Sequence, residues 1–257
     1  MIAGPNFDAF HANLIHYLLE WAGILAGMQY YRYQKRQRGQ GALLAPGNFA
    51  IVVGCIAGAA LGNKLVFWIE YAHLIPQKIG DPRNWFMGQS IVGGLLGGLL
   101  GVEISKKLIG QRESTGDLFV FPLLLGIIIG RIGCFLAGLH DGTYGLPGNL
   151  PWAVDFGDGQ PRHPTQLYEI GFLSLLWFVL QSQRARLASQ NGLLFKLFLT
   201  AYLCWRVAVD GIKPIPYVYP FGLSGIQWVC LLALALYLPG LLKQWQAWRH
   251  PRILQGR

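Results

Sequence analysis

Long runs of apolar residues, separated by short polar segments, recur along the whole chain. A helix that crosses a bilayer needs roughly 20 apolar residues, and seven runs come close to that length. They lie at about 12–30, 47–69, 89–109, 118–138, 166–182, 193–210 and 223–242. The pattern predicts an all-α, polytopic membrane protein of about seven transmembrane helices, forming a single transmembrane domain over residues 1–257.

Composition agrees with this prediction. The chain is 53% hydrophobic and only 13% charged, whereas soluble domains carry about 25% charged residues. Glycines recur at helical spacing in GCIAGAALG (54–62) and GGLLGGLLG (93–101). Small residues at this spacing let two helices approach closely, so we expect these glycines to serve helix packing.

The net charge of +9 is distributed unevenly between alternating loops. Four basic residues fall in one set of loops: Lys78, Arg83, Arg162 and Lys213. Most of the others fall in the opposite set, including Arg32, Lys35, Arg36, Arg38, Lys106, Lys107, Arg112, Arg184, Arg186, Lys196, Lys243 and Arg249. Cytoplasmic loops carry such an excess, which predicts an outer N-terminus and a cytoplasmic C-terminus. The basic surplus therefore reflects topology, and we expect no nucleic-acid partner.

The four cysteines all fall within predicted spans, at Cys55, Cys134, Cys204 and Cys230. They show neither a CxxC spacing nor a paired histidine, so the sequence suggests no disulfide framework, no metal site and no cofactor. We expect them to pack as small apolar residues.

One loop is much longer than the others. Residues 139–165 are rich in Gly, Pro and Asp and include Tyr144 and Trp152. The charge pattern places this loop outside the cell. A loop of this length is usually functional or disordered, and its aromatic residues argue against simple disorder.

Three basic residues lie inside predicted spans: Lys64, Arg131 and Arg206. A charge inside a bilayer costs several kcal/mol and marks a functional site by default, and the planar arginine side chain suits phosphate oxygens. The alternative is a set of buried ion pairs that hold the helices together. Arg206 and Asp210, four residues apart, are the simplest such pair, and Lys64 could extend toward the interface.

The segments GRIGCFLAGLHDG (130–142) and RHPTQLYE (162–169) resemble two motifs of the bacterial prolipoprotein diacylglyceryl transferases. Six of nine defined positions of the first motif match, and the second is present from His163 onward. GNKL (62–65), VGGLLG (92–97) and LSGIQ (223–227) resemble further family elements in the same order. Arg206, Asp210 and Lys213 stand where the family has R-x-x-x-E-x-x-R.

The resemblance implies an enzyme of the bacterial plasma (inner) membrane. Such an enzyme moves the diacylglyceryl group of phosphatidylglycerol, a membrane lipid, to the thiol of a lipobox cysteine in a prolipoprotein. By resemblance, Arg131 and Arg206 are the catalytic residues. The residues expected to bind substrate are Lys64, Gly142, His163, Gln166, Tyr168, Glu169 and Asp210.

The chain also departs from the family pattern. Cys134 and Ala137 replace two asparagines, Leu139 replaces a glutamate, and Val92 replaces a histidine that precedes Gly-Gly. His140 and His163 are the nearby histidines in sequence, and His163 could instead serve the loop structure. Two alternatives therefore remain open: a divergent enzyme with another acceptor, and a non-enzymatic phospholipid-binding membrane protein.

Overall fold

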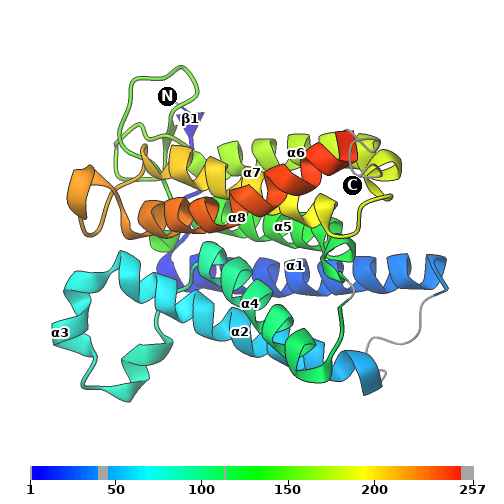
Figure 1. The fold of residues 1–257 in the computed structure, drawn as a ribbon. Helices are drawn as coiled ribbons and strands as arrows, with labels where there is room; N and C mark the ends of the chain where they lie inside the picture. Colours follow the sequence, from blue (N-terminus) through cyan, green and yellow to red (C-terminus); the bar gives the residue numbers. More distant parts are fainter. Residues whose placement is uncertain (1, 40–45, 113, 250–257) are drawn as a thin grey trace. The chain divides into compact units, whose positions relative to one another are not determined.

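The computed structural model describes residues 2–39, 46–112 and 114–249. Within these ranges the long elements are seven helices, and each overlaps one of the predicted apolar segments (Figure 1). They are α1 (Ala9–Gln37), α2 (Pro46–Glu70), α4 (Ile91–Ile109), α5 (Val120–Ala137), α6 (Thr165–Leu187), α7 (Leu193–Asp210) and α8 (Gly225–Arg249). The prediction of an all-α chain is confirmed.

By length and composition, three of the described helices could cross a membrane. These apolar stretches are Phe49–Glu70, Val120–Asp141 and Gly225–Trp248. Many of their large apolar side chains are exposed, among them Ile56, Leu232 and Leu236. Exposed apolar surface of this extent suits contact with lipid rather than water.

The chain divides into two compact units. The first unit contains α1, α5, α6 and the first residues of α7. Helix α1 packs along α5, which in turn packs against α6. The close approach of α1 to α5 depends on Gly23 and Gly27, because a Cβ at these positions would lie 2.7 Å from Gly126 O and 2.8 Å from Pro122 O.

The long loop at 139–165 also belongs to the first unit. It begins with a short 3₁₀ helix, η4 (Gly138–Asp141), and contains strand β2 (Val154–Asp155), which pairs in parallel with β1 (Ile2–Ala3). Phe156 is buried under this pairing. This small sheet was not predicted, because two-residue strands leave no alternating pattern that can be recognised in a sequence.

The second unit contains α2, α4, most of α7, and α8. Helices α2 and α4 pack through their glycines: Gly58 faces Gly97, and Gly62 faces Gly93. The expectation that these residues serve packing is confirmed. Short helices follow α2, namely η1 (Ala72–Leu74), α3 (Ile75–Lys78) and η2 (Pro82–Phe86).

Polar caps fix the ends of several helices. In the first unit, the Asp117 carboxylate in η3 (Gly116–Leu118) accepts hydrogen bonds from the backbone N–H groups of Gly192 and Phe195 at the start of α7. In the second unit, the Glu70 carboxylate accepts the backbone N–H of Ile226 in the first turn of α8, at 2.7 Å. Acidic groups at helix N-termini satisfy unpaired N–H groups and complement the helix dipole.

Candidate active site

In the first unit, Arg131 forms a buried ion pair. It lies in the second half of α5, between apolar residues, and its side chain is 5% exposed. Its Nε lies 2.9 Å from Oε2 of Glu169 on α6, whose side chain is 1% exposed. A guanidinium so far from water requires a compensating charge, and the packing of α5 on α6 provides one.

Gln166 lies one helical turn before Glu169, so the two side chains share a face of α6. Gln166 is 1% exposed. Neither its amide oxygen nor its amide nitrogen forms a hydrogen bond with the described residues. A buried amide without partners costs roughly 1–3 kcal/mol. A residue in this condition, one turn from the carboxylate that pairs with Arg131, is suited to contact a polar ligand.

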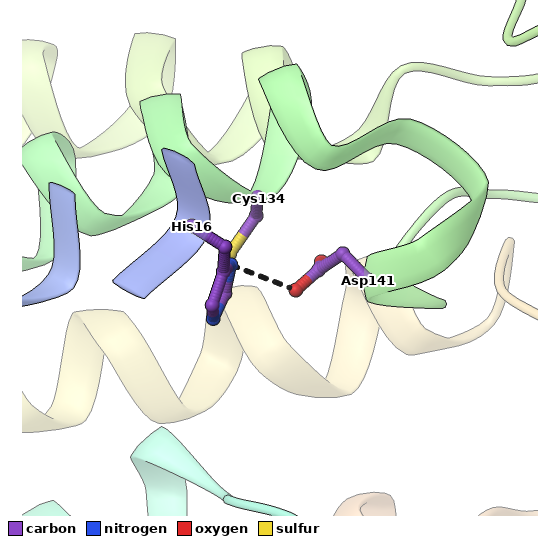
Figure 2. Close-up of side chains that lie close together, drawn as sticks. All are labelled: His16, Cys134 and Asp141. Carbon is purple, nitrogen blue, oxygen red and sulfur yellow. Dashed lines mark ion pairs between the residues drawn. The ribbon is translucent and has the colours of Figure 1, made fainter. Parts of the chain in front are cut away.

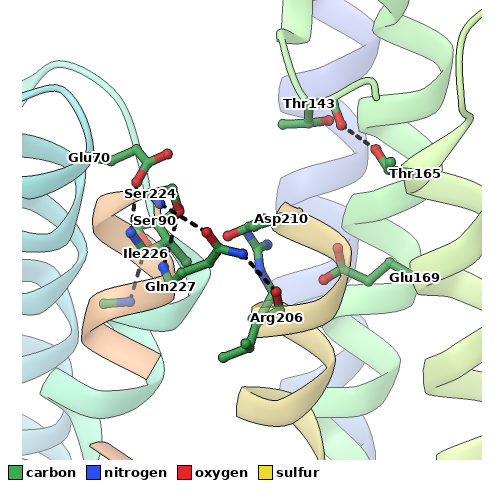
Figure 3. A network of polar contacts seen from close by, with 12 residues as sticks. Glu70, Ser90, Thr143, Thr165, Glu169, Arg206, Asp210, Ser224, Ile226 and Gln227 are labelled. Carbon is green, nitrogen blue, oxygen red and sulfur yellow. Dashed lines mark hydrogen bonds and ion pairs between the residues drawn. The ribbon is translucent and has the colours of Figure 1, made fainter. Parts of the chain in front are cut away.

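The start of α6 is fixed by the loop that precedes it. Pro164 prevents the helix from extending further back, and the Thr165 hydroxyl donates to the backbone oxygen of Thr143 (Figure 3). This contact ties α6 to the residues that follow η4. The HPTQLYE segment thereby brings Gln166 and Glu169 onto α5.

A second group forms around Tyr168. Its hydroxyl accepts a hydrogen bond of 2.8 Å from Trp152 Nε1, and it lies 3.3 Å from Nδ1 of His163. The backbone of His163 bonds to Gly145 and Leu146 in the same long loop. His163 therefore serves the loop structure, which is one of the two roles that the sequence suggested for it.

Gly142, also expected in the site, ends η4 with a left-handed φ of 67° and is exposed. Farther along the loop, Arg162 Nη2 lies 2.5 Å from Asp158 Oδ2, and its guanidinium lies over the Tyr144 ring at 4.7 Å. The hydrogen bond from Arg162 lowers the pKa of the Asp158 carboxyl. These contacts give the long loop an ordered structure.

In the second unit, Arg206 pairs with Asp210 on the same helix, as the spacing predicted. Its Nη2 lies 2.7 Å and 3.1 Å from the two carboxylate oxygens, and both residues are buried. On α8, the Gln227 amide donates to the backbone oxygen of Val207 (Figure 3). Gln227 also bonds reciprocally with Ser224, as in a helix cap.

Lys64 has a different environment from the one that the sequence suggested. Its Nζ donates to the backbone oxygens of Phe86 (2.8 Å) and Gly88 (2.6 Å), which lie 22 and 24 residues after Lys64 in the chain. Lys64 therefore fastens the end of η2 and the segment after it to α2. Within each unit, then, the structure pairs Arg131 with Glu169, which lies one turn after Gln166 on α6, and pairs Arg206 with Asp210.

The first unit also brings together three residues that the sequence did not connect: His16, Cys134 and Asp141 (Figure 2). They come from α1, α5 and η4. The histidines that the sequence places in or near the two motifs at 130–142 and 162–169 are His140 and His163. His16 is more than 110 residues away along the chain, so no spacing rule could have found it.

Comparisons with known proteins agree with the motifs. The family model described as prolipoprotein diacylglyceryl transferase matches residues 14–242. A phosphatidylglycerol–prolipoprotein diacylglyceryl transferase of Bordetella avium is 31% identical, over 94% of this chain and 95% of the relative. Proteins of the same name from Rhodospirillum rubrum (29%, covering 93% and 91%) and Leptothrix cholodnii (28%, covering 97% and 99%) are also similar. The chain is therefore a member of the prolipoprotein diacylglyceryl transferase family.

Proposed function

We propose that this protein transfers a diacylglyceryl group from phosphatidylglycerol to the lipobox cysteine thiol of a prolipoprotein. The cysteine sulfur, as thiolate, attacks the glycerol carbon that carries the phosphodiester oxygen. A C–S bond forms, the C–O bond breaks, and its electron pair leaves on glycerol phosphate. The thiol proton is released before the attack or during it.

The buried Arg131–Glu169 pair is the main support for this proposal, together with the buried amide of Gln166, one turn before Glu169, which has no hydrogen-bond partner among the described residues. Negative charge builds on phosphate oxygen as the C–O bond breaks. A fixed guanidinium in a water-poor site stabilises that charge more than it stabilises the substrate. Glu169 holds Arg131 in place, and Gln166 supplies an amide that a phosphate or glycerol oxygen would satisfy.

The second arginine has a related role in the proposal. Arg206 binds phosphate oxygen, and Asp210 orients the Arg206 guanidinium through two contacts to one nitrogen. Tyr168 and His163 shape the substrate entry with the outer loop. The further proposed contributors are Gly142, at the turn after η4, and Lys64, through the segment that it fastens.

The family and the three apolar helices make the chain a multi-pass membrane protein. We propose in addition that seven helices span the bacterial inner membrane as one domain, with the N-terminus outside and the C-terminus in the cytoplasm. The uneven distribution of basic loops supports this orientation. The acceptor, a lipobox cysteine, would then meet the enzyme from the outer side.

A second candidate function is transfer to another thiol or hydroxyl. The residues around Arg131 favour it, since Cys134, Ala137 and Leu139 stand where the family motif has two amides and a carboxylate. The arginine is retained while its polar neighbours differ. Such a change alters which acceptor is recognised without removing phosphate binding.

A transfer assay tests the proposal. The purified protein, in micelles containing phosphatidylglycerol, is given a lipobox peptide, and mass spectrometry detects the diacylglyceryl adduct and released glycerol phosphate. We expect product from the wild type, and a loss of about 10²–10³-fold in Arg131→Ala. Arg83→Ala, at an exposed position in η2, is the matched control and should keep full activity.

Each outcome has a distinct reading. Full activity in Arg131→Ala would overturn the assigned role of this residue. In another outcome, a folded wild type gives no lipobox adduct but releases glycerol phosphate when other thiols or alcohols are added. That result would show that the acceptor is not a lipobox cysteine. Phospholipid that co-purifies without any turnover would overturn the enzymatic proposal.

A further inference from the structure

Three different ligand types converge on one point in the first unit. A ring nitrogen of His16, the Cys134 Sγ and a carboxylate oxygen of Asp141 all lie within 4.8 Å of one another. His16 Nδ1 is 3.3 Å from Asp141 Oδ1 (Figure 2). Because the atoms come from α1, α5 and η4, their convergence is a product of the tertiary fold.

The surroundings of the three atoms leave this point open to a ligand. His16 Nδ1 is buried and has no hydrogen-bond partner of adequate geometry among the described residues. Cys134 is 7% exposed and the Asp141 side chain is 8% exposed. The Thr143 hydroxyl donates to Oδ2 of Asp141, which leaves Oδ1 directed toward His16.

The second ring nitrogen of His16 supports the same interpretation. Nε2 lies 4.0 Å from Oε2 of Glu20, one turn later on α1. In metal sites the ligating histidine commonly donates its other N–H to a carboxylate, and ligating carboxylates are themselves hydrogen-bonded. Thr143 makes the supporting hydrogen bond to Asp141, and Glu20 places a carboxylate near Nε2, although at 4.0 Å it is beyond hydrogen-bond distance.

We propose that His16, Cys134 and Asp141 form a binding site for a zinc-class divalent cation. Imidazole nitrogen, thiolate and carboxylate are the ligands that Zn²⁺ takes, and three protein ligands leave a fourth position for water or another small ligand. On binding, the Cys134 thiol loses its proton to solvent and its sulfur becomes the metal ligand. The inference depends on this geometry and not on the proposed transfer reaction.

Arg131 modifies the affinity of the site. Its Nη1 lies 3.6 Å from Cys134 Sγ, so the guanidinium favours the thiolate form but also repels a divalent cation. The site should therefore bind zinc more weakly than a closed site of four ligands. Metal bound at the site would in turn hold the Cys134 sulfur and weaken its contact with Arg131, which is itself the proposed phosphate-binding group.

Metal binding to the full-length protein tests the proposal. Protein purified without a polyhistidine tag is stripped with a chelator, desalted, and dialysed against Zn²⁺, and elemental mass spectrometry gives the stoichiometry. Co²⁺ serves as the spectroscopic probe, since a thiolate ligand produces a near-ultraviolet charge-transfer band. We expect one ion per chain and a Co²⁺–thiolate band in the wild type.

Variants assign the ligands. Cys134→Ser should abolish the Co²⁺–thiolate band, and His16→Gln and Asp141→Asn should each weaken Zn²⁺ binding at least 10-fold. The matched controls are Cys204→Ser, which removes an exposed thiol on α7, and His140→Gln, which removes an exposed imidazole beside Asp141. Both controls should bind as the wild type does.

Two results would overturn the proposal: a stripped wild type that binds neither Zn²⁺ nor Co²⁺, or a charge-transfer band that persists in Cys134→Ser. If a variant does not fold, the spectrum of wild-type protein with Co²⁺ decides the question alone. No transfer substrate is present in these measurements. A failure of the metal site therefore leaves the proposed function untouched, and failure of the transfer assay leaves the metal site untouched.

Discussion

Replacing Gly97 by alanine should destabilise the contact between α2 and α4. A Cβ on Gly97 would overlap the backbone oxygen of Gly58, and it would lie 2.9 Å from Gly62 Cα and 3.0 Å from the Gly58 carbonyl carbon. Carbon atoms in contact prefer about 3.5–4.0 Å. These neighbours are backbone atoms of a helix, so no side chain can rotate away, and the two helices must separate.

The size of the effect follows from that separation. A gap of about 0.5–1 Å forfeits a quarter to a half of each dispersion contact along the interface, and overpacked sites typically lose 1–3 kcal/mol. Alanine is favoured over glycine in a helix by about 1 kcal/mol, which offsets part of the loss. Gly94→Ala isolates this second effect, because a Cβ on Gly94 would have no neighbour within 4 Å.

The free energy of unfolding of both variants can be measured in mixed micelles by titration with a denaturing detergent. We expect Gly97→Ala to be less stable than Gly94→Ala by about 1–3 kcal/mol. Equal stability of the two variants would refute the reasoning, since they share host helix and substitution and differ only in what the methyl group meets.

Three further results are expected. Glu169→Gln should lower the free energy of unfolding by about 3–5 kcal/mol, because it removes the charge beside buried Arg131, and Arg131→Met in the same chain should restore most of it; a single variant as stable as the wild type would contradict this. Asp210→Asn should slow transfer about 10- to 100-fold, because it misplaces the Arg206 side chain. Asp210→Glu should recover part of the rate; no recovery would mean that the role of Asp210 is only structural. The pKa of Asp158 is lowered in the folded protein. Its ion pair with Arg162 therefore stabilises the folded state above the ordinary carboxyl pKa, and this contribution is lost as pH falls below about 3.8. Thermal unfolding should therefore show Asp158→Asn slightly less stable than the wild type at pH 7, by under about 1 kcal/mol, with the difference vanishing in acid; a difference constant with pH would rule the ion pair out.

The sequence predicted the features that depend on local spacing. Apolar length located the seven long helices of the described residues, since a long apolar run favours a long helix. The spacing of four residues predicted the pair of Arg206 with Asp210. Glycine repeats predicted close helix packing at 54–62 and 93–101, because small residues recur there at helical spacing, but they did not predict that α2 and α4 pack against each other.

The features that depend on tertiary contact could not be predicted in this way. The motifs marked Arg131 and Glu169 separately, but their ion pair arises only when α6 packs on α5. The contacts of Lys64 with the backbone oxygens of Phe86 and Gly88 were not predicted either, because every residue type carries a backbone oxygen. His16 lay outside every motif, and only the packing of α1 on α5 brings it to Cys134.

The packing of α1 on α5 has a consequence for synthesis of the chain. Helix α1 ends at Gln37 and α5 begins at Val120, so the ribosome must add the whole of α2 and α4 before α1 meets its partner. At 5–20 residues per second, that delay is roughly 4–17 s. During this time the helix face that carries Gly23 and Gly27 lacks its protein partner, and lipid or an insertion factor must contact it instead. Biogenesis of this protein should thus be sensitive to cellular factors that shelter an early, unpaired helix.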